Sequence, residues 1–152
     1  MAIYMGLDSS TQSLTAVVIR VDGENREVLD QRSIRFDEDL ASYGCQNGVL
    51  VHSDPLVAHS NPLMWAEALD RLFEVLSSEG DFSLGEIQAI AGSGQQHGSV
   101  YLNSSAEARL SSIDPSAPLV GQLQDIFSRP TSPIWMDSST AGECELITDE
   151  LG

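Results

Sequence analysis

Two apolar runs separated by a short polar segment open this chain, and this pattern constrains its fold more than any other feature. Residues 3–7 (IYMGL) form the first run, and residues 14–21 (LTAVVIRV) form the second. Both are rich in large or β-branched side chains, which favour strands. The residues between them, 8–13, are all polar. The pattern therefore predicts a hairpin of two antiparallel strands with a polar tip.

A third strand and a long helix are predicted next. Residues 22–25 (DGEN) have the composition of a turn, and residues 26–36 alternate enough to predict a more exposed strand. Residues 37–60 are a long polar segment. Asn61 and Pro62 then fit the cap and the first position of a helix. This helix should end by Gly80, and its apolar stripe would contain Trp65, Ala68, Leu69, Leu72, Phe73 and Leu76.

The second half alternates short apolar segments with polar ones. Residues 87–91 (IQAIA), 99–102 (SVYL) and 134–136 (IWM) are strand candidates. A capping box over residues 140–143 predicts a last helix. Strands followed by helices in this order predict an α/β chain with a mixed sheet. Because the last helix would end at Gly152 with little left to pack on, we expect a truncated domain over residues 1–152.

The charge balance limits the partners that this chain can have. Its 23 acidic residues face seven arginines and no lysine, which gives a formal net charge of -16. Nucleic acid and anionic membranes require basic surface, so neither is an expected partner. No apolar run approaches the ~20 residues of a membrane span, and the first residues lack the features of a signal peptide. Two cysteines far apart give no disulfide framework, and we expect a cytoplasmic protein.

The polar tip of the hairpin is the first candidate site. A P-loop needs a lysine, which this chain lacks. Successive backbone N–H groups at a tight tip can instead form a nest for an anion. Asp8 is placed to bind Mg²⁺, which favours one or two carboxylates plus phosphate oxygens. The predicted phosphate and magnesium site consists of Asp8, Ser9, Ser10, Thr11 and Gln12. An ordinary hairpin turn, which uses the same residue types, remains an alternative.

A second polar cluster follows the strand at residues 87–91. Gly92 and Gly94 do not complete a dinucleotide-binding motif, since a third glycine comes one position late and a strand-like segment follows. The amides of Gln95 and Gln96 and the imidazole of His97 supply both donors and acceptors, which suits a polyhydroxylated ligand. Capping of neighbouring backbone is the alternative.

A third polar cluster lies near the last helix. The indole of Trp135 offers a face for the C–H surface of a sugar, and Asp137 can accept hydrogen bonds from hydroxyl groups. The alternative is a core tryptophan followed by a helix cap. His52 and His59 stand alone in the polar segment, and no set of carboxylates or thiols around them indicates a metal site.

These three segments together resemble the FGGY family of carbohydrate kinases. Residues 5–12 (MGLDSSTQ) resemble the family's first phosphate motif. Residues 94–98 (GQQHG) are similar to the sugar-contact strand of its xylulokinases, and residues 133–139 (PIWMDSS) to a W-x-D stretch. A glycerol kinase would show Arg-Glu where this chain has Gln96 and His97, which favours a ketose.

The resemblance implies a two-domain, ribonuclease H-like (actin-like ATPase) kinase that closes over Mg-ATP and a sugar. The implied reaction transfers the γ-phosphate of ATP to D-xylulose. Asp8 would serve the magnesium and phosphates, Gln96 and His97 would line the sugar pocket, and Trp135 and Asp137 would lie near it. The family's aspartate base and its nucleotide-binding domain would lie beyond residue 152, so we expect the chain alone to be inactive.

Several alternatives stay open at this level. A related kinase could act on ribulose or another polyol, and the full-length form could be a homodimer. A non-catalytic actin-like ATPase fragment would share the phosphate hairpin but would not account for the two sugar-type clusters. A small acidic interaction module would explain every cluster as turn chemistry.

Overall fold

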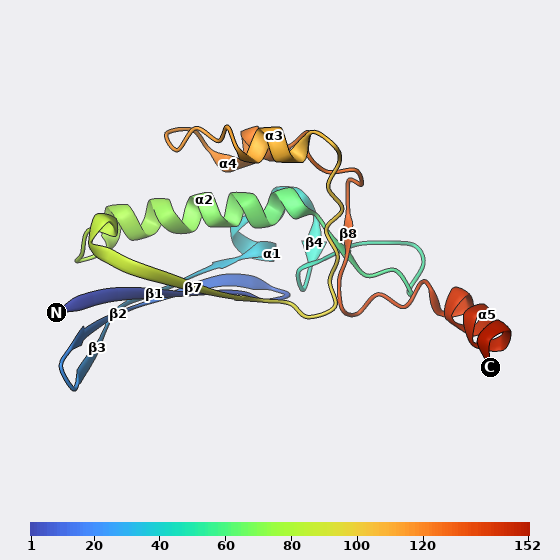
Figure 1. Cartoon of the computed structure of the whole chain (residues 1–152), viewed down its shortest axis with the longest axis horizontal. Helices are drawn as coiled ribbons and strands as arrows, with labels where there is room; N and C mark the ends of the chain where they lie inside the picture. Colours follow the sequence, from blue (N-terminus) through green and yellow to red (C-terminus); the bar gives the residue numbers. More distant parts are fainter.

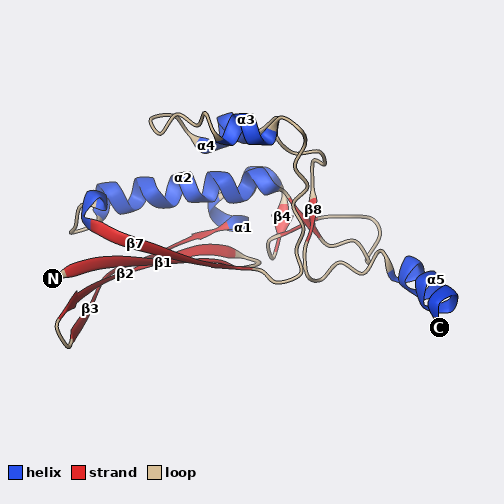
Figure 2. Cartoon of the chain, in the orientation of Figure 1, coloured by secondary structure: helices blue, strands red, loops and turns tan.

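The predicted hairpin is confirmed and lies in the middle of a four-stranded sheet. The structure, a computed structural model, describes residues 1–152. The sheet has the order β3-β2-β1-β7, with β1 Ala2–Ser9, β2 Ser13–Asp22, β3 Asn25–Arg35 and β7 Ile87–Gly94. The first three strands are antiparallel, and β7 lies parallel to β1. The predicted mixed sheet with three leading antiparallel strands is therefore correct (Figures 1 and 2).

The long helix α2, Pro62–Glu79, begins as the sequence predicts. Asn61 Oδ1 accepts a hydrogen bond from the backbone N–H of Leu63 at 2.9 Å. Pro62 stands at the first helical position, where no backbone donor is needed. At the other end, the N–H of Gly80 donates to the carbonyl of Leu76. Local capping thus fixes both ends of the helix.

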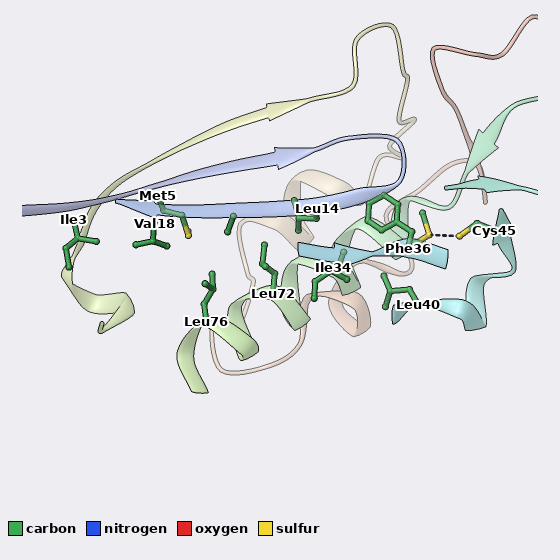
Figure 3. Close-up of a cluster of buried hydrophobic side chains, with 13 residues drawn as sticks. Ile3, Met5, Leu14, Val18, Ile34, Phe36, Leu40, Cys45, Leu72 and Leu76 are labelled. Carbon is green, nitrogen blue, oxygen red and sulfur yellow. Dashed lines mark hydrogen bonds between the residues drawn. The ribbon is translucent and has the colours of Figure 1, made fainter. Parts of the chain in front are cut away.

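The hydrophobic core lies between α2 and one face of the sheet (Figure 3). Alternate residues of β1 and β2 point toward the helix, because side chains on a strand alternate between faces. Phe36 and Leu40 close the core beyond the end of β3. Each fully buried large side chain contributes roughly 1.5–3 kcal/mol. The buried members are Ile3, Met5, Leu14, Ala16, Val18, Ile34, Phe36, Leu40, Cys45, Met64, Ala68, Leu72 and Leu76.

The other face of the sheet carries no helix, and α3 and α4 lie on the far side of α2 from the sheet (Figures 1 and 2). Tyr4 on β1 and Ile90 on β7 are exposed. Because β1 and β7 are parallel neighbours, their carboxyl ends meet at an accessible edge of this sheet. No helix of the structure is both long and apolar enough to cross a membrane.

The connecting segments contain short elements that the sequence did not reveal. Residues 37–60, predicted as a polar loop, contain two short helical turns and three two-residue strands. Residues 103–133 contain two short helices and a two-residue strand, and one further helical turn directly precedes β7. These elements are α1 Phe36–Asp39, η1 Ala41–Tyr43, β4 Cys45–Gln46, β5 Val49–Leu50, β6 His59–Ser60, η2 Leu84–Glu86, α3 Ala106–Leu110, α4 Leu119–Leu123 and β8 Ser132–Pro133.

Three local predictions are wrong. Residues 99–102 form no strand, because Ser99 donates to the carbonyl of Pro133 and no neighbouring strand completes a ladder. The strand expected at residues 134–136 lies earlier, at β8, since the chain turns where the N–H of Asp137 donates to the carbonyl of Ile134. The last helix exists as α5, Ala141–Leu151, but the Thr140 side chain makes no cap hydrogen bond. Helix α5 projects away from the rest of the chain and is exposed throughout (Figure 1).

Candidate functional site

The tip of the β1–β2 hairpin presents free backbone donors. The N–H of Ser10 donates to the carbonyl of Ser13 at 2.9 Å, and the Ser10 hydroxyl reaches the same carbonyl at 3.2 Å. These bonds close the tip. The amide groups of Thr11 and Gln12 donate to no protein acceptor. Two adjacent unpaired amides at a tight turn suit the binding of an anion such as phosphate.

Asp8 lies at the end of β1, directly opposite Ser93 at the end of β7. The Ser93 hydroxyl donates to Asp8 Oδ1 at 2.6 Å, which orients the carboxylate. No protein donor reaches the second oxygen, and the side chain is exposed. Nowhere in the chain do three His, Cys, Asp or Glu side chains gather to hold a metal. A magnesium ion at Asp8 would therefore depend on phosphate oxygens and water for its remaining ligands.

Gly48 packs directly behind the hairpin tip. Its φ is +76°, and a Cβ built on it would lie 1.8 Å from the carbonyl oxygen of Thr11. The carbonyl of Gln12 accepts from the N–H of Phe36 at 3.0 Å on the same side. The tip is thus held from behind by backbone, with no room for a side chain at residue 48.

The turn that carries Gly48 is fixed by a carboxylate and a buried hydroxyl. Asp37 accepts from the backbone N–H groups of Asn47 and Gly48 and from the thiol of Cys45. Burial raises the pKa of Asp37, but these three hydrogen bonds outweigh it and the net pKa lies below the ordinary value. The fully buried Ser60 hydroxyl donates to the carbonyl of Gly48 at 2.6 Å. We refer to Asp37, Gly48 and Ser60 as the hairpin brace.

A cleft of about 350 Å³ joins the tip of the β1–β2 hairpin to the polar cluster after β7. The structure therefore brings together two groups of residues that were predicted separately, from positions far apart in the chain. Gln95 joins them at the floor, where its side-chain amide donates to the carbonyl of Ser10 at 3.3 Å. The lining residues are Asp8, Ser10, Thr11, Gly94, Gln95, Gln96, His97 and Trp135. Ser9 lines a neighbouring cavity, and Gln12 is exposed at the tip beside the cleft.

Trp135 links the two sides of this cleft. Its indole N–H donates to the hydroxyl of Thr11 at 3.0 Å, across 124 residues of sequence. The side chain stays 56% exposed, which leaves an aromatic face free for the C–H surface of a sugar. A ligand that moved the indole would therefore also act on the hairpin tip.

His97 has an uncommon backbone conformation. Its φ is +61°, in the left-handed region that costs a residue with a Cβ roughly 1–2 kcal/mol. Neither His97 nor Gln96 hydrogen-bonds to another protein group, and both are exposed. Strained backbone held in place by its surroundings is concentrated at functional sites. The imidazole is thus presented to the cleft at a conformational cost.

Replacing His97 tests this cost separately from binding. His97→Gly and His97→Ala both remove the imidazole, so each should weaken sugar binding about 10-fold, as expected for the loss of one strong polar contact. Only glycine relieves the left-handed strain. The free energy of unfolding of His97→Gly should therefore be about 1 kcal/mol higher than that of His97→Ala. Urea unfolding of the two variants measures the difference. Equal stabilities would contradict the strain argument, and unchanged sugar binding would remove His97 from the site.

Asp137 lies outside the cleft, although the sequence groups it with Trp135. Its carboxylate accepts from the Ala58 N–H at 2.9 Å and from the Ser139 hydroxyl at 2.7 Å. It also pairs with His59 Nε2 at 3.2 Å, and its side chain is only 8% exposed. It therefore ties the turn after β8 to the start of β6. The structure thus gives Asp137 a positioning role next to Trp135, while a contact between Asp137 and a sugar stays a prediction.

Burial raises the pKa of the Asp137 carboxyl, but hydrogen bonds from Ser139 and Ala58 and the nearby His59 outweigh it, so the net pKa lies below its ordinary value. Because the folded-state pKa is the lower one, the contribution to stability is present above the unfolded pKa and is lost as the pH falls through the folded one. Asp137→Asn should cost about 1–3 kcal/mol at neutral pH. The cost should shrink at pH 3, since the unfolded wild-type chain then takes up protons that the folded carboxylate binds less readily.

Urea unfolding at the two pH values measures this loss. Asp149→Asn on the exposed helix α5 is the matched control and should leave stability unchanged at both. A cost for Asp137→Asn that is the same at pH 7 and pH 3 would contradict the assignment.

Sequence reasoning missed three contributors to the site. Gly48 and Asp37 lie in the segment that was predicted to be a polar loop, and only their backbone contacts reveal a role. His59 was considered only as a metal ligand, but the structure pairs it with Asp137 and with the hydroxyl of Thr131 at 2.8 Å. The Asn47-Gly48 pair, which is typical of a tight turn, was the one available signal.

Comparisons with known proteins find similarity to xylulose kinases. No family model matches the chain. Xylulose kinase of Mus musculus is 44% identical over 148 residues, which cover 97% of this chain and 26% of that protein. Xylulose kinase 2 of Arabidopsis thaliana is 39% identical over 154 residues, with 99% and 26% covered. The chain thus spans about a quarter of the length of the curated relatives that it matches.

A solved structure supports the same assignment at the level of the fold. The ligand-bound xylulose kinase from Lactobacillus acidophilus superposes with a TM-score of 0.65 at 17% identity, over 99% of this chain and 23% of that one. The chain is thus similar over nearly its whole length to about a quarter of two xylulose kinases, and it shares the actin-like, ribonuclease H-like fold of a solved one.

Proposed function

We propose that this chain forms part of an ATP-dependent ketose kinase and binds the phosphates of Mg-ATP next to D-xylulose. The single observation that carries the proposal is the cleft in which Asp8 and Thr11 of the phosphate hairpin face Gln96, His97 and Trp135. Phosphoryl transfer depends mainly on bringing two substrates together in the right orientation. A cleft lined on one side by anion-binding groups and on the other by neutral polar groups suits that task.

The phosphate side would work without a lysine. The free amides of Thr11 and Gln12 would donate to phosphate oxygens. Asp8 would hold Mg²⁺, either directly or through water, and when bound the ion would neutralise charge on the phosphates. A magnesium ion between Asp8 and the phosphates would also limit the repulsion between these negative groups, in a chain whose net charge is already -16.

The sugar side would recognise hydroxyl groups. Gln96 offers a donor and an acceptor, and His97 offers the same pair as neutral imidazole. Trp135 would pack against the carbon skeleton while its N–H holds Thr11. In the reaction, the 5-hydroxyl oxygen of the ketose would attack the γ-phosphorus as the bond to ADP breaks, and its proton would pass to a carboxylate base.

That base is expected outside these residues. Asp8 is the only carboxylate that lines the cleft, and the proposal assigns it to magnesium. We therefore expect binding by this chain but no turnover. Purified chain incubated with Mg-ATP and D-xylulose should form no ADP above the level of an Asp8→Asn control. Xylulose-dependent ADP formation that Asp8→Asn abolishes would contradict the assignment of the base.

The choice of sugar can be tested by binding alone. The indole resonance of Trp135 should shift on titration with D-xylulose, and less with D-ribulose or glycerol, because hydroxyl positions decide the contacts. Equal shifts with all three ligands would contradict specificity for a ketose and would indicate a site that binds polyols in general. The acidic surface supports small-molecule partners over nucleic acid, because a net charge of -16 repels polyanions.

A further inference from the structure

The indole of Trp135 and the hydroxyl of Thr11 meet across the cleft, and the chemistry of the two groups fixes the direction of their hydrogen bond. The indole Nε1 lies 3.0 Å from Thr11 Oγ1. An indole N–H can only donate, so the hydroxyl oxygen must be the acceptor. The single hydroxyl hydrogen of Thr11 is therefore directed away from Trp135 and is available to a different acceptor.

No protein group takes up this hydrogen. Thr11 Oγ1 makes no hydrogen bond besides the one with Trp135. The neighbouring hydroxyl at the tip differs, because Ser10 Oγ lies 3.2 Å from the carbonyl of Ser13 and donates to it. Thr11 also lines the cleft, and its backbone N–H is free. One residue of the hairpin tip thus offers two donors to a ligand, one from the main chain and one from the side chain.

The position of the Thr11 hydroxyl is fixed from two sides. Behind the tip, Gly48 packs so closely against the carbonyl of Thr11 that the main chain there cannot shift backward. Threonine is β-branched, so few χ1 rotamers are open to its side chain. The bond from Trp135 selects one of them. Because a hydroxyl that accepts a hydrogen bond is polarised by it, the indole also makes the hydroxyl a stronger donor.

An anionic oxygen is the acceptor that suits these two donors best. Hydrogen bonds to a charged acceptor are roughly twice as strong as those between neutral groups. Asp8 is the only carboxylate that lines the cleft, and it accepts from Ser93 and not from Thr11. The acceptor for the Thr11 hydroxyl therefore has to come from a ligand.

We propose that Trp135 is a positioning residue for the phosphates of the nucleotide, because its N–H holds Thr11 Oγ1 so that the Thr11 hydroxyl donates to a phosphate oxygen. The inference rests on the proposed function for the identity of the ligand. Thr11 would touch the phosphate, and Trp135 would act on it only through Thr11. One tryptophan would then serve both substrates, since its ring faces the sugar while its N–H orders the phosphate side.

Two substitutions each remove one partner of this hydrogen bond. Thr11→Val keeps the shape of the side chain and removes the hydroxyl, and Mg-ATP should bind about 10-fold more weakly. Trp135→Phe keeps an aromatic ring and removes the N–H. It should weaken Mg-ATP about 5-fold, because the hydroxyl remains but is no longer held. In the double variant the second change should add nothing, since the two residues act as one unit.

Calorimetric titration of the 152-residue chain with Mg-ATP gives the four dissociation constants of this cycle, and two further variants serve as controls. Thr11→Ser restores the hydroxyl and should bind within about 2-fold of wild type. Trp65→Phe makes the same chemical change at an indole whose N–H has no partner in the protein, and it should leave the affinity for Mg-ATP unchanged.

The ¹⁵N-labelled chain gives a second measurement. Mg-ATP alone, without sugar, should shift the indole resonance of Trp135, and saturating Mg-ATP should no longer shift it in Thr11→Val. Additive losses in the double variant, or wild-type affinity of Thr11→Val for Mg-ATP, would overturn the positioning role and leave the proposed function standing. If the wild-type chain shows no saturable binding of Mg-ATP, the proposed function fails and this inference fails with it.

Discussion

Gly48→Ala is expected to destabilise this protein by roughly 2–5 kcal/mol and to displace the phosphate hairpin, although it adds one methyl group. The added Cβ would meet the carbonyl oxygen of Thr11 at 1.8 Å and its carbonyl carbon at 2.7 Å. These atoms are backbone and cannot turn aside as a flexible side chain would. The positive φ of residue 48 adds a further cost of about 1–2 kcal/mol for any residue with a Cβ.

Gly23→Ala is the matched control for this experiment. Gly23 also has a positive φ, +62°, but a Cβ there would have no neighbour within 4 Å. Its replacement should therefore cost only about 1–2 kcal/mol. Urea unfolding gives both free energies, and the amide resonances of Thr11 and Gln12 report the hairpin. If the two variants lose equal stability and the Thr11 resonance does not move, Gly48 does not brace the hairpin.

Asp8→Asn is expected to reverse the effect of magnesium on nucleotide binding. Asparagine keeps the shape and can still accept from Ser93, so the fold should be unchanged. Without the carboxylate, Mg-ATP should bind about 10-fold more weakly, a difference of about 1.4 kcal/mol. Metal-free ATP should bind as well as before or better, because a negative charge beside the phosphates has been removed.

Titrations of wild type and Asp8→Asn, each with Mg²⁺ and with a chelator, separate these two effects. Asp81→Asn, in the exposed loop after α2, is the control that removes one charge far from the cleft. Its effect should be small and should fall with salt, since long-range interactions between exposed charges are screened. A uniform loss of binding for Asp8→Asn in both conditions would argue against a magnesium ligand.

Features set by local sequence were predictable. The hairpin followed from two apolar runs around a polar tip, and α2 followed from Asn61, Pro62 and a helical apolar stripe, because capping and periodicity act over a few residues. The polar clusters that line the cleft were also found from their residue types and their order, although they were predicted separately. That they line one cleft follows from the parallel pairing of β7 with β1, which an α/β pattern already favours.

Features set by contacts between distant segments were not predictable. Gly48 looks like any turn glycine until its backbone is seen against Thr11. Asp137 was grouped with Trp135 by sequence, but the turn after Ile134 aims it at Ala58 and away from the cleft. Residues 99–102 had a strand composition but no strand partner, so composition alone gave the wrong element.

The most direct test of the central claim is a single titration that follows both sides of the cleft. In the ¹⁵N-labelled chain, Mg-ATP should shift the amides of Thr11 and Gln12, and D-xylulose should shift the indole of Trp135. Each effect should saturate in the millimolar range. D-Xylulose should also move the Thr11 amide, because Trp135 holds the Thr11 hydroxyl. Ligand-induced shifts confined to residues outside the cleft, or no saturable shift with either ligand, would contradict the account.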